Sequence, residues 1–519
     1  MAGPDNLRTR RSALTFGSGL LMTAVTIAVA FVSTPLLLRW LGAERFGAVR
    51  ALSDWLGHLT LLELGLAGAI GPVLAHALAQ ADRTQLARAF SAGVRAFTLV
   101  AALALVAGAV VAFFIPALVP VHPGLRLDLR FAALIGLVGL ALYPMLPFRV
   151  LAEAGQRGYA VHGYALAQSL VATSLALVLA WRGFGITGQL AALVTGQAVF
   201  AALCAVDGLR RLSVLRTARW SDGAGGEAER RLWQLNLPTL FTSFAGRIGL
   251  FTDNTVVALM LGPGQVAPLF LTQRLLALAG QQLLGLGNAS WAALAELHAL
   301  GRHEDFRARL LDLTRLVSGL AVAMLGPIAA WNHHFVARWV GAPAYAGDTV
   351  TLLAAVNGWM MALLSLWGWC FGGTGLIRAL VPPALASGTL NLGLSIAATR
   401  LVGLPGPLWG TLLGLGATSL WMVPLLLRRH FGISVGALTR AVLTPVAWGA
   451  PLTAALWWLA RAHEPPAGWL GLGAEMGGGM VILLGLWWFF ALTEAERETF
   501  RERLRFAMRG DDRGARGEE

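Results

Sequence analysis

Charged side chains inside long apolar runs are the residues of this sequence best suited to chemistry. Asp54 and Glu63 fall in one such run, Arg247 and Asp253 in another, and Arg274 in a third. A charge inside a bilayer is costly unless it is paired or faces water. A carboxylate there can take up a proton or a cation, whereas a guanidinium holds phosphate through paired hydrogen bonds. We therefore take the three carboxylates as candidates for ion coupling or gating, and the two arginines as candidate anion contacts.

The runs that carry these charges have the length of membrane helices. Of the 519 residues, 56% are hydrophobic and 13% are charged. An α-helix of about 20 apolar residues crosses a hydrocarbon core of roughly 30 Å. Backbone polar groups in lipid must be bonded internally, and the sequence lacks the short alternation of an outer-membrane barrel. The fold class is therefore all-α, with about fourteen transmembrane helices beginning near residues 13, 47, 91, 129, 159, 187, 237, 267, 310, 348, 379, 408, 440 and 469.

An internal repeat organises these spans at an offset of 220 residues. Leu41-Gly42 recurs as Leu261-Gly262, and Gly155 recurs as Gly375. Six spans per half is an even number, so both halves should have one orientation and be related by a pseudo-two-fold axis along the membrane normal. The predicted parts are an N-terminal lobe (1–207), a cytosolic linker (208–233), a C-terminal lobe (234–430), two additional helices (431–492) and a cytosolic tail with an amphipathic helix (493–519).

Arginine distribution predicts the orientation of the spans. The chain has no lysine, and most of its 40 arginines gather in the segments that are cytosolic if both termini are cytosolic, while the outer turns keep about nine. This is the positive-inside bias, so we expect a multi-pass protein of the cytoplasmic (inner) membrane. The net charge of +13 then reflects topology, and no nucleic-acid partner is expected because the arginines are scattered through short loops. Most tryptophans near predicted span ends are expected in the interfacial belt, a set that includes Trp40, Trp181, Trp331, Trp339, Trp409 and Trp469.

Motifs of catalysis and of cofactor binding are missing from the sequence. Cys204 and Cys370 fall inside predicted spans, which suggests neither a disulfide nor a metal site. We find no phosphate-binding loop, no metal-ligand spacing and no nucleophile elbow. The sequence therefore predicts no cofactor, no metal and no enzymatic activity.

Two interpretations of the membrane charges stay open. Asp54 and Arg274 are related by the 220-residue offset, so they should lie at similar depth in the two lobes and could form a gating pair across a cavity. Alternatively, the charges form internal pairs that only hold the bundle together. Arg50, four residues before Asp54 on the same helix face, is the nearest such partner.

The first two spans carry a family resemblance. The segments Pro35 to Gly47 and Leu61 to Leu66 resemble the first two helices of the oligosaccharide (Wzx-type) flippases of the multidrug/oligosaccharidyl-lipid/polysaccharide (MOP) exporter superfamily. Asp253, eight residues before Leu261-Gly262, resembles the seventh-helix motif. Two features depart from the pattern: the first helix has no internal charge, unlike that of peptidoglycan-precursor flippases, and two helices exceed the twelve of many relatives.

The resemblance implies a function as well as a fold. It implies two lobes, a central cavity lined by helices one, two, seven and eight, and alternating access. We expect a flippase that moves a polyprenyl-diphosphate-linked oligosaccharide to the outer leaflet for lipopolysaccharide or exopolysaccharide assembly. Its partners would be the lipid-linked oligosaccharide, membrane lipids and polysaccharide assembly proteins. A multidrug or cation antiporter of the same superfamily is the main alternative, and a membrane glycosyl polymerase or ligase is a weaker one because the predicted outer loops are short.

Overall fold

A computed structural model describes residues 4–59, 66–80, 82–212, 253–464 and 468–491, together with positions 226, 466, 494, 497 and 498. Every regular element in these ranges is helical, which confirms the all-α class. The helices are α1 (Pro4–Leu59), α2 (Leu66–Ala79), α3 (Arg83–Leu118), α4 (Arg126–Leu140), α5 (Leu146–Ala154), α6 (Gly158–Trp181), α7 (Gly185–Arg211), α10 (Asp253–Leu261), α11 (Val266–Ala299), α12 (His303–Val340), α13 (Asp348–Gly373), α14 (Val381–Val402), α15 (Gly406–Ala417), α16 (Ser419–Phe431), α17 (Val435–Ala462) and α18 (Trp469–Leu486). Short 3₁₀ turns join several of them, namely η2 (Pro123–Leu125), η3 (Tyr143–Met145), η4 (Pro263–Gln265), η5 (Ala342–Ala344) and η6 (Ile377–Leu380), and α18 continues into a π-helical turn, η7 (Trp487–Ala491).

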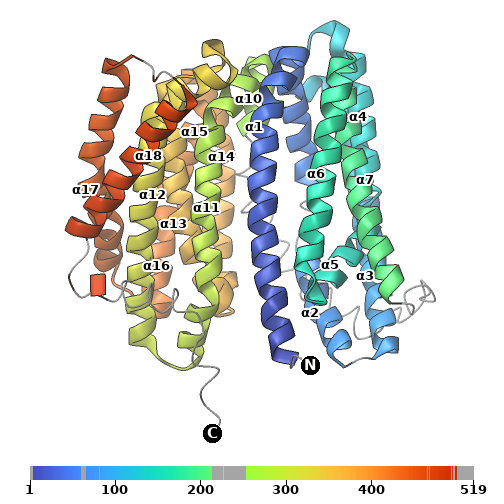
Figure 1. Ribbon diagram of the computed structural model, residues 1–519, viewed down its shortest axis with the longest axis horizontal. Helices are drawn as coiled ribbons and strands as arrows, with labels where there is room; N and C mark the ends of the chain where they lie inside the picture. Colours follow the sequence, from blue (N-terminus) through green and yellow to red (C-terminus); the bar gives the residue numbers. More distant parts are fainter. Residues whose placement is uncertain are drawn as a thin grey trace. The chain divides into compact units, whose positions relative to one another are not determined.

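Membrane-spanning helices dominate the described part of the chain (Figure 1). Eleven of its helices are long and apolar enough to cross a bilayer. Helix α1 contains a break in its backbone at Gly42 (φ 76°, ψ 167°). The first predicted span precedes this break, and the second predicted span begins after it. Helix α11 covers the eighth predicted span, and the seventh falls largely outside the described residues. The prediction of a polytopic membrane protein is confirmed.

The 220-residue repeat is visible in the backbone. Gly42 and Gly262 both have a positive φ, of 76° and 90°, and the pair Gly183 and Gly403 does so as well, with 82° and 72°. L side chains rarely adopt this conformation, so glycine is required where each half makes the same turn. At these two turns the repeat is one of local structure and not only of leucine-rich composition, whereas Gly155 (φ −79°) and Gly375 (φ 76°) differ in conformation. The predicted boundaries of lobes and linker stay a prediction.

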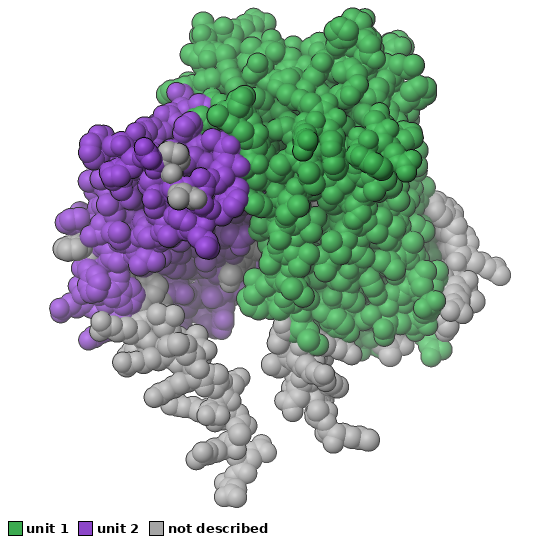
Figure 2. All heavy atoms as spheres, turned by 45° about the horizontal axis from the view of Figure 1, so that its top comes forward, with its two compact units in different colours: residues 1–271, 339–346, 380–418 green, residues 272–338, 347–379, 419–519 purple. Residues whose placement is uncertain are grey.

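The chain forms two compact units, which Figure 2 distinguishes by colour. Unit 1 comprises residues 1–271, 339–346 and 380–418, and unit 2 comprises residues 272–338, 347–379 and 419–519. In unit 1, α2, α3 and α5 share an apolar core in which Phe90 meets Phe148 edge to face, with ring centroids 4.8 Å apart. Helices α17 and α18 belong to unit 2.

A proline in α1 explains one long-range contact of unit 1. In an uninterrupted helix the N–H of residue 35 would donate to the Phe31 carbonyl, but Pro35 has no N–H. The indole Nε1 of Trp339 donates to that oxygen at 2.7 Å, and the two aromatic rings stack with centroids 5.6 Å apart. Trp339 and Trp331 are buried, 7% and 1% exposed, so these two side chains pack inside the protein, whereas Trp40, Trp181 and Trp469 of the same set are exposed.

Glycines let α14 and α15 pack closely in unit 1. Gly406, Gly410 and Gly414 recur every four residues and lie against Thr399, Ser395 and Asn391 of α14. Such spacing places small residues on one helix face and brings two backbones together in a membrane. The Asn391 amide also donates to the Thr411 hydroxyl at 3.0 Å, so the contact includes a buried hydrogen bond.

We predict that Gly410→Ala destabilises the protein by about 1–3 kcal/mol, the usual cost of overpacking a tight interface. A Cβ at this position would collide with the backbone nitrogen and Oγ of Ser395. Gly416→Ala, on the same helix, is the matched control, because a Cβ there meets nothing within 4 Å. Thermal unfolding in detergent should show a lower midpoint for the first variant only, and equal midpoints would show that the α14–α15 contact is looser than described.

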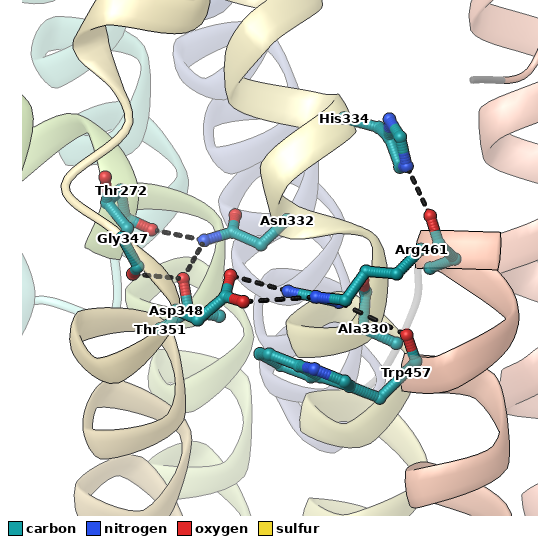
Figure 3. A network of polar contacts seen from close by, with 10 residues as sticks. Thr272, Ala330, Asn332, His334, Gly347, Asp348, Thr351, Trp457 and Arg461 are labelled. Carbon is teal, nitrogen blue, oxygen red and sulfur yellow. Dashed lines mark hydrogen bonds and ion pairs between the residues drawn. The ribbon is translucent and has the colours of Figure 1, made fainter. Parts of the chain in front are cut away.

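In unit 2, polar contacts attach α17 to α12 and α13 (Figure 3). Arg461 of α17 pairs with both carboxylate oxygens of Asp348, at 2.5 and 3.1 Å, and its guanidinium lies 3.8 Å from the centroid of the Trp457 ring. His334 of α12 contacts the Ala460 carbonyl at 2.6 Å. Near this network the fully buried Asn332 donates to the Thr272 carbonyl and to Thr351 Oγ1. Helix α17 is therefore an integrated part of unit 2.

Candidate functional site

Two of the predicted coupling residues come together in unit 1. Asp54 lies on α1, and Asp253 begins the described part of α10, which packs against α1. The Asn254 amide donates to Asp54 Oδ2 at 2.9 Å, and the charge of Asp54 acts on the Asp253 carboxylate. Among the described residues, no hydrogen-bond partner reaches the buried Oδ1 of Asp253. We call Asp54 and Asp253 the carboxylate pair.

A glycine makes this approach of the two segments geometrically feasible. Gly47 of α1 lies directly against η4, the turn that follows α10, and a Cβ at Gly47 would collide with the Pro263 carbonyl. Asp54 is seven residues beyond Gly47, about two helical turns and roughly 10 Å along α1. Small-residue packing at Gly47 thus places Asp54 beside the beginning of α10.

Arg50 and His58 lie on the same face of α1 as Asp54. The Arg50 guanidinium lies 4.2 Å from the centroid of the Phe270 ring and 5.1 Å from that of Phe46, and its charge acts on Asp54 one helical turn away. His58 Nδ1 donates to the Asp54 carbonyl at 2.7 Å. The interpretation of Arg50 and Asp54 as an internal pair thus keeps a structural basis, with the cation held over two aromatic rings.

The remaining predicted site residues are placed less fully. Arg274 lies half-buried on α11 in unit 2. Glu63 and Arg247 lie outside the described residues. The gating pair of Asp54 with Arg274 stays a prediction, as do the roles of all five site residues.

Asn254 is the residue of this site that the sequence analysis missed. It follows Asp253 directly in an otherwise apolar run, and its amide contacts Asp54. The signal that could have found it is polarity, because a side-chain amide inside a membrane helix also needs a partner. A search for charged residues does not find Asn254, because its side chain is neutral.

The carboxylate pair has the chemistry of a cation or proton site. Two carboxylates close together in a medium of low dielectric constant repel each other, and one bound proton or cation relieves that repulsion. The Asn254 side chain adds a neutral oxygen of the kind that hard cations accept as a ligand. In the ranges that the structure covers, no group of three or more histidine, cysteine or acidic side chains is arranged to hold a metal ion.

Solved structures share this arrangement of helices over nearly the whole chain. A lipid II flippase MurJ in an inward closed conformation matches with a TM-score of 0.62 and 11% identity, covering 91% of this chain and 98% of the flippase. An inward-facing multidrug resistance MATE family transporter of the MOP superfamily matches with a TM-score of 0.55 and 15% identity, covering 84% of this chain and 98% of the transporter. A MATE structure in the bent conformation matches with a TM-score of 0.52 and 16% identity, covering 88% of this chain and 98% of the MATE chain.

The chain has the fold of the MOP-superfamily transporters. No family model matches it, and no curated protein does. At 11–16% identity these likenesses establish the fold alone, and they include both a lipid flippase and drug transporters. The choice between these functions depends on the residues of this chain.

Proposed function

We propose that this protein is an inner-membrane flippase that moves a polyprenyl-diphosphate-linked oligosaccharide to the outer leaflet by alternating access. The observation that carries the proposal is the pair of arginines, Arg247 and Arg274, in predicted membrane spans of a chain with this fold, and a fold likeness to a lipid II flippase supports it. That likeness extends over 91% of this chain, against 84–88% for the MATE structures. The translocated glycan would then be used to build surface polysaccharide.

Arginine chemistry supports an anionic substrate. A diphosphate that leaves water needs fixed cations, and a guanidinium offers it two parallel hydrogen bonds. Arg274 on α11 and Arg247 in the preceding predicted span are the cations that we assign to this task. A cationic drug would be repelled by the same groups.

The carboxylate pair supports a coupled mechanism. Protonation or cation binding at Asp54 and Asp253 would change the charge between α1 and α10, and Glu63, nine residues beyond Asp54, is the third candidate. A gradient of that ion could then drive the protein between its states, because it favours binding on one side of the membrane.

A cation or multidrug antiporter is the second candidate function. The same carboxylate pair favours it, as does the likeness to MATE transporters. The two functions differ in the charge of the cargo, which decides how the arginines should behave on substitution. A glycosyl polymerase or ligase has no support from the described site.

Orientation follows from the arginine distribution and is open to a direct test. We expect a reporter fused at residue 225 to be cytosolic and one at His333 to be external, with the tail after Thr493 cytosolic. Activity of paired cytosolic and periplasmic reporters at each position measures this. An external residue 225 would overturn the span count and the proposed direction of transport.

Deletion of the gene tests the proposed function in cells. Loss of a flippase should leave lipid-linked oligosaccharide in the cytosolic leaflet and remove polymer from the cell surface. We expect both effects, with restoration by the wild-type gene. A deletion strain with normal surface polysaccharide and increased sensitivity to cationic dyes would favour the antiporter.

A further inference from the structure

A cavity of about 340 Å³ lies wholly inside unit 1, bounded by α1, α4, α5, α6 and α7. Its walls contain Ser53 of α1, Gln168 of α6 and Gln197 of α7. Ser53 is the neighbour of Asp54, but it lines this cavity while Asp54 contacts Asn254 of α10. The cavity is therefore a second polar feature beside the carboxylate pair.

The polar side chains of this cavity have unused hydrogen-bonding capacity. Within the described residues, no hydrogen-bond partner contacts the side chains of Ser53, Gln168 or Gln197. Gln168 is the eleventh residue of α6 and Gln197 the thirteenth of α7, so both amides lie roughly 15–20 Å along their helices, near the middle of the membrane. These side chains are partly buried and line the cavity, so a polar occupant could take up their hydrogen bonds.

Glycine leaves room for one of these amides. A Cβ at Gly139 of α4 would lie 2.7 Å from Gln197 Oε1, closer than real Cβ atoms approach such a group. Gly136, one turn earlier, also faces the cavity. The packing of α4 against α7 thus keeps the Gln197 side chain in the cavity wall.

The lining is mostly apolar, and its few polar side chains suit a neutral ligand that carries hydroxyl groups. No carboxylate from the described part of the chain lines the cavity, so a cationic drug finds no counter-charge. Among the described lining residues the one charged side chain is Arg149, which forms an exposed ion pair with Glu153 at 2.9 Å, so the cavity offers a diphosphate a single, partly neutralised cation. Amide and hydroxyl groups both donate and accept, as sugar hydroxyls do, and the volume lies at the lower end of ligand pockets, roughly 300–1,000 Å³.

We propose that this cavity is a subsite for a sugar ring of the transported oligosaccharide, held by hydrogen bonds to Ser53, Gln168 and Gln197. The inference rests on the proposed flippase function, because it takes the sugar to be part of the cargo. It assigns recognition of the glycan to unit 1 and separates it from recognition of the diphosphate. The subsite should therefore govern which glycan is moved, and not whether a diphosphate lipid is moved.

Transport by reconstituted full-length protein tests this subsite. The probes are lipid-linked oligosaccharide extracted from deletion cells and a polyprenyl diphosphate that carries no sugar. We expect the Gln168→Leu/Gln197→Leu double variant to lose about tenfold or more in transport of the complete oligosaccharide, relative to the sugar-free lipid, because two net hydrogen bonds contribute about that factor. Gly139→Ala, which pushes the Gln197 amide aside without removing it, should shift the same ratio in the same direction.

Gln189→Leu is the matched control on α7. Its amide donates to the Ala176 carbonyl at 3.0 Å and does not line the cavity, so this change should leave the ratio of the two transport rates unchanged. If the double variant and Gly139→Ala, present at wild-type amounts, keep the wild-type ratio, the sugar subsite is wrong while the flippase stands. If the wild-type protein moves neither lipid, the proposed function itself fails.

Discussion

Replacing both Arg247 and Arg274 by glutamine is expected to reduce transport of lipid-linked oligosaccharide by two orders of magnitude or more. Hydrogen bonds to charged groups contribute roughly 1.5–3 kcal/mol each, and about 1.4 kcal/mol is a factor of ten. Each single Gln variant should lose about tenfold or more. Lysine at either position should restore only part of the activity, because an ammonium group supplies the charge without the paired donors.

The matched control for this series is Arg440→Gln. Arg440 is exposed on α17, and the same change there should leave transport intact. Initial rates in proteoliposomes, normalised to the amount of folded protein, measure the effect. Full transport by the well-folded double Gln variant would exclude the anion role and leave both arginines as structural residues. Unchanged or increased efflux of a cationic dye in the same variant would support the antiporter.

Asp253→Asn is expected to uncouple transport from the driving ion. The substitution keeps the side-chain volume nearly constant and removes the charge that a proton or cation would neutralise. A pH difference of one unit supplies about 1.4 kcal/mol, a factor of ten in an equilibrium ratio. Wild-type transport should respond to an imposed proton or sodium gradient, whereas Asp253→Asn should transport at one rate with or without it. Asp54→Asn should act in the same direction, since Asp54 is the other member of the carboxylate pair.

Glu475→Gln controls for the loss of any membrane carboxylate. Glu475 is exposed on α18 in unit 2, whereas the carboxylate pair belongs to unit 1. This variant should keep the wild-type response to the gradient. A normal gradient response in folded Asp253→Asn would show that Asp253 has no coupling role, and the carboxylate pair would then be structural.

The fold could be predicted from the sequence because membrane helices are specified locally. Apolar runs and glycine turns report the spans and the repeat directly, and Gly42 and Gly262 adopt the same backbone conformation as the repeat requires. The kink at Gly42 could be foreseen from the repeat, but the contact of Trp339 with Phe31 could not. That contact joins residues far apart in sequence and depends on how the carbonyl released by Pro35 finds a donor.

The candidate site was predictable only in part, for a related reason. Asp54 and Asp253 stand out as formal charges in apolar sequence, and the structure brings them together. Asn254, Gln168 and Gln197 carry no charge, and which of them face a partner, a cavity or lipid depends on the packing of other helices. The position of the Gln197 side chain in particular depends on the absence of a side chain at Gly139, which lies on another helix. The sequence therefore shows where the polar residues are in the chain, but helix packing decides whether each of them faces a partner, a cavity or lipid.

Reconstitution of the purified protein tests the central claim most directly. Proteoliposomes would contain lipid-linked oligosaccharide in both leaflets, and an added glycosidase would report the fraction of glycan that becomes accessible from outside. We predict that the protein raises the rate at which the glycan becomes accessible about tenfold or more over protein-free liposomes, and that the double Gln variant of Arg247 and Arg274 removes most of the increase. Accessibility no faster than in empty liposomes, together with uptake of a cationic dye against an ion gradient, would contradict the flippase and establish the antiporter.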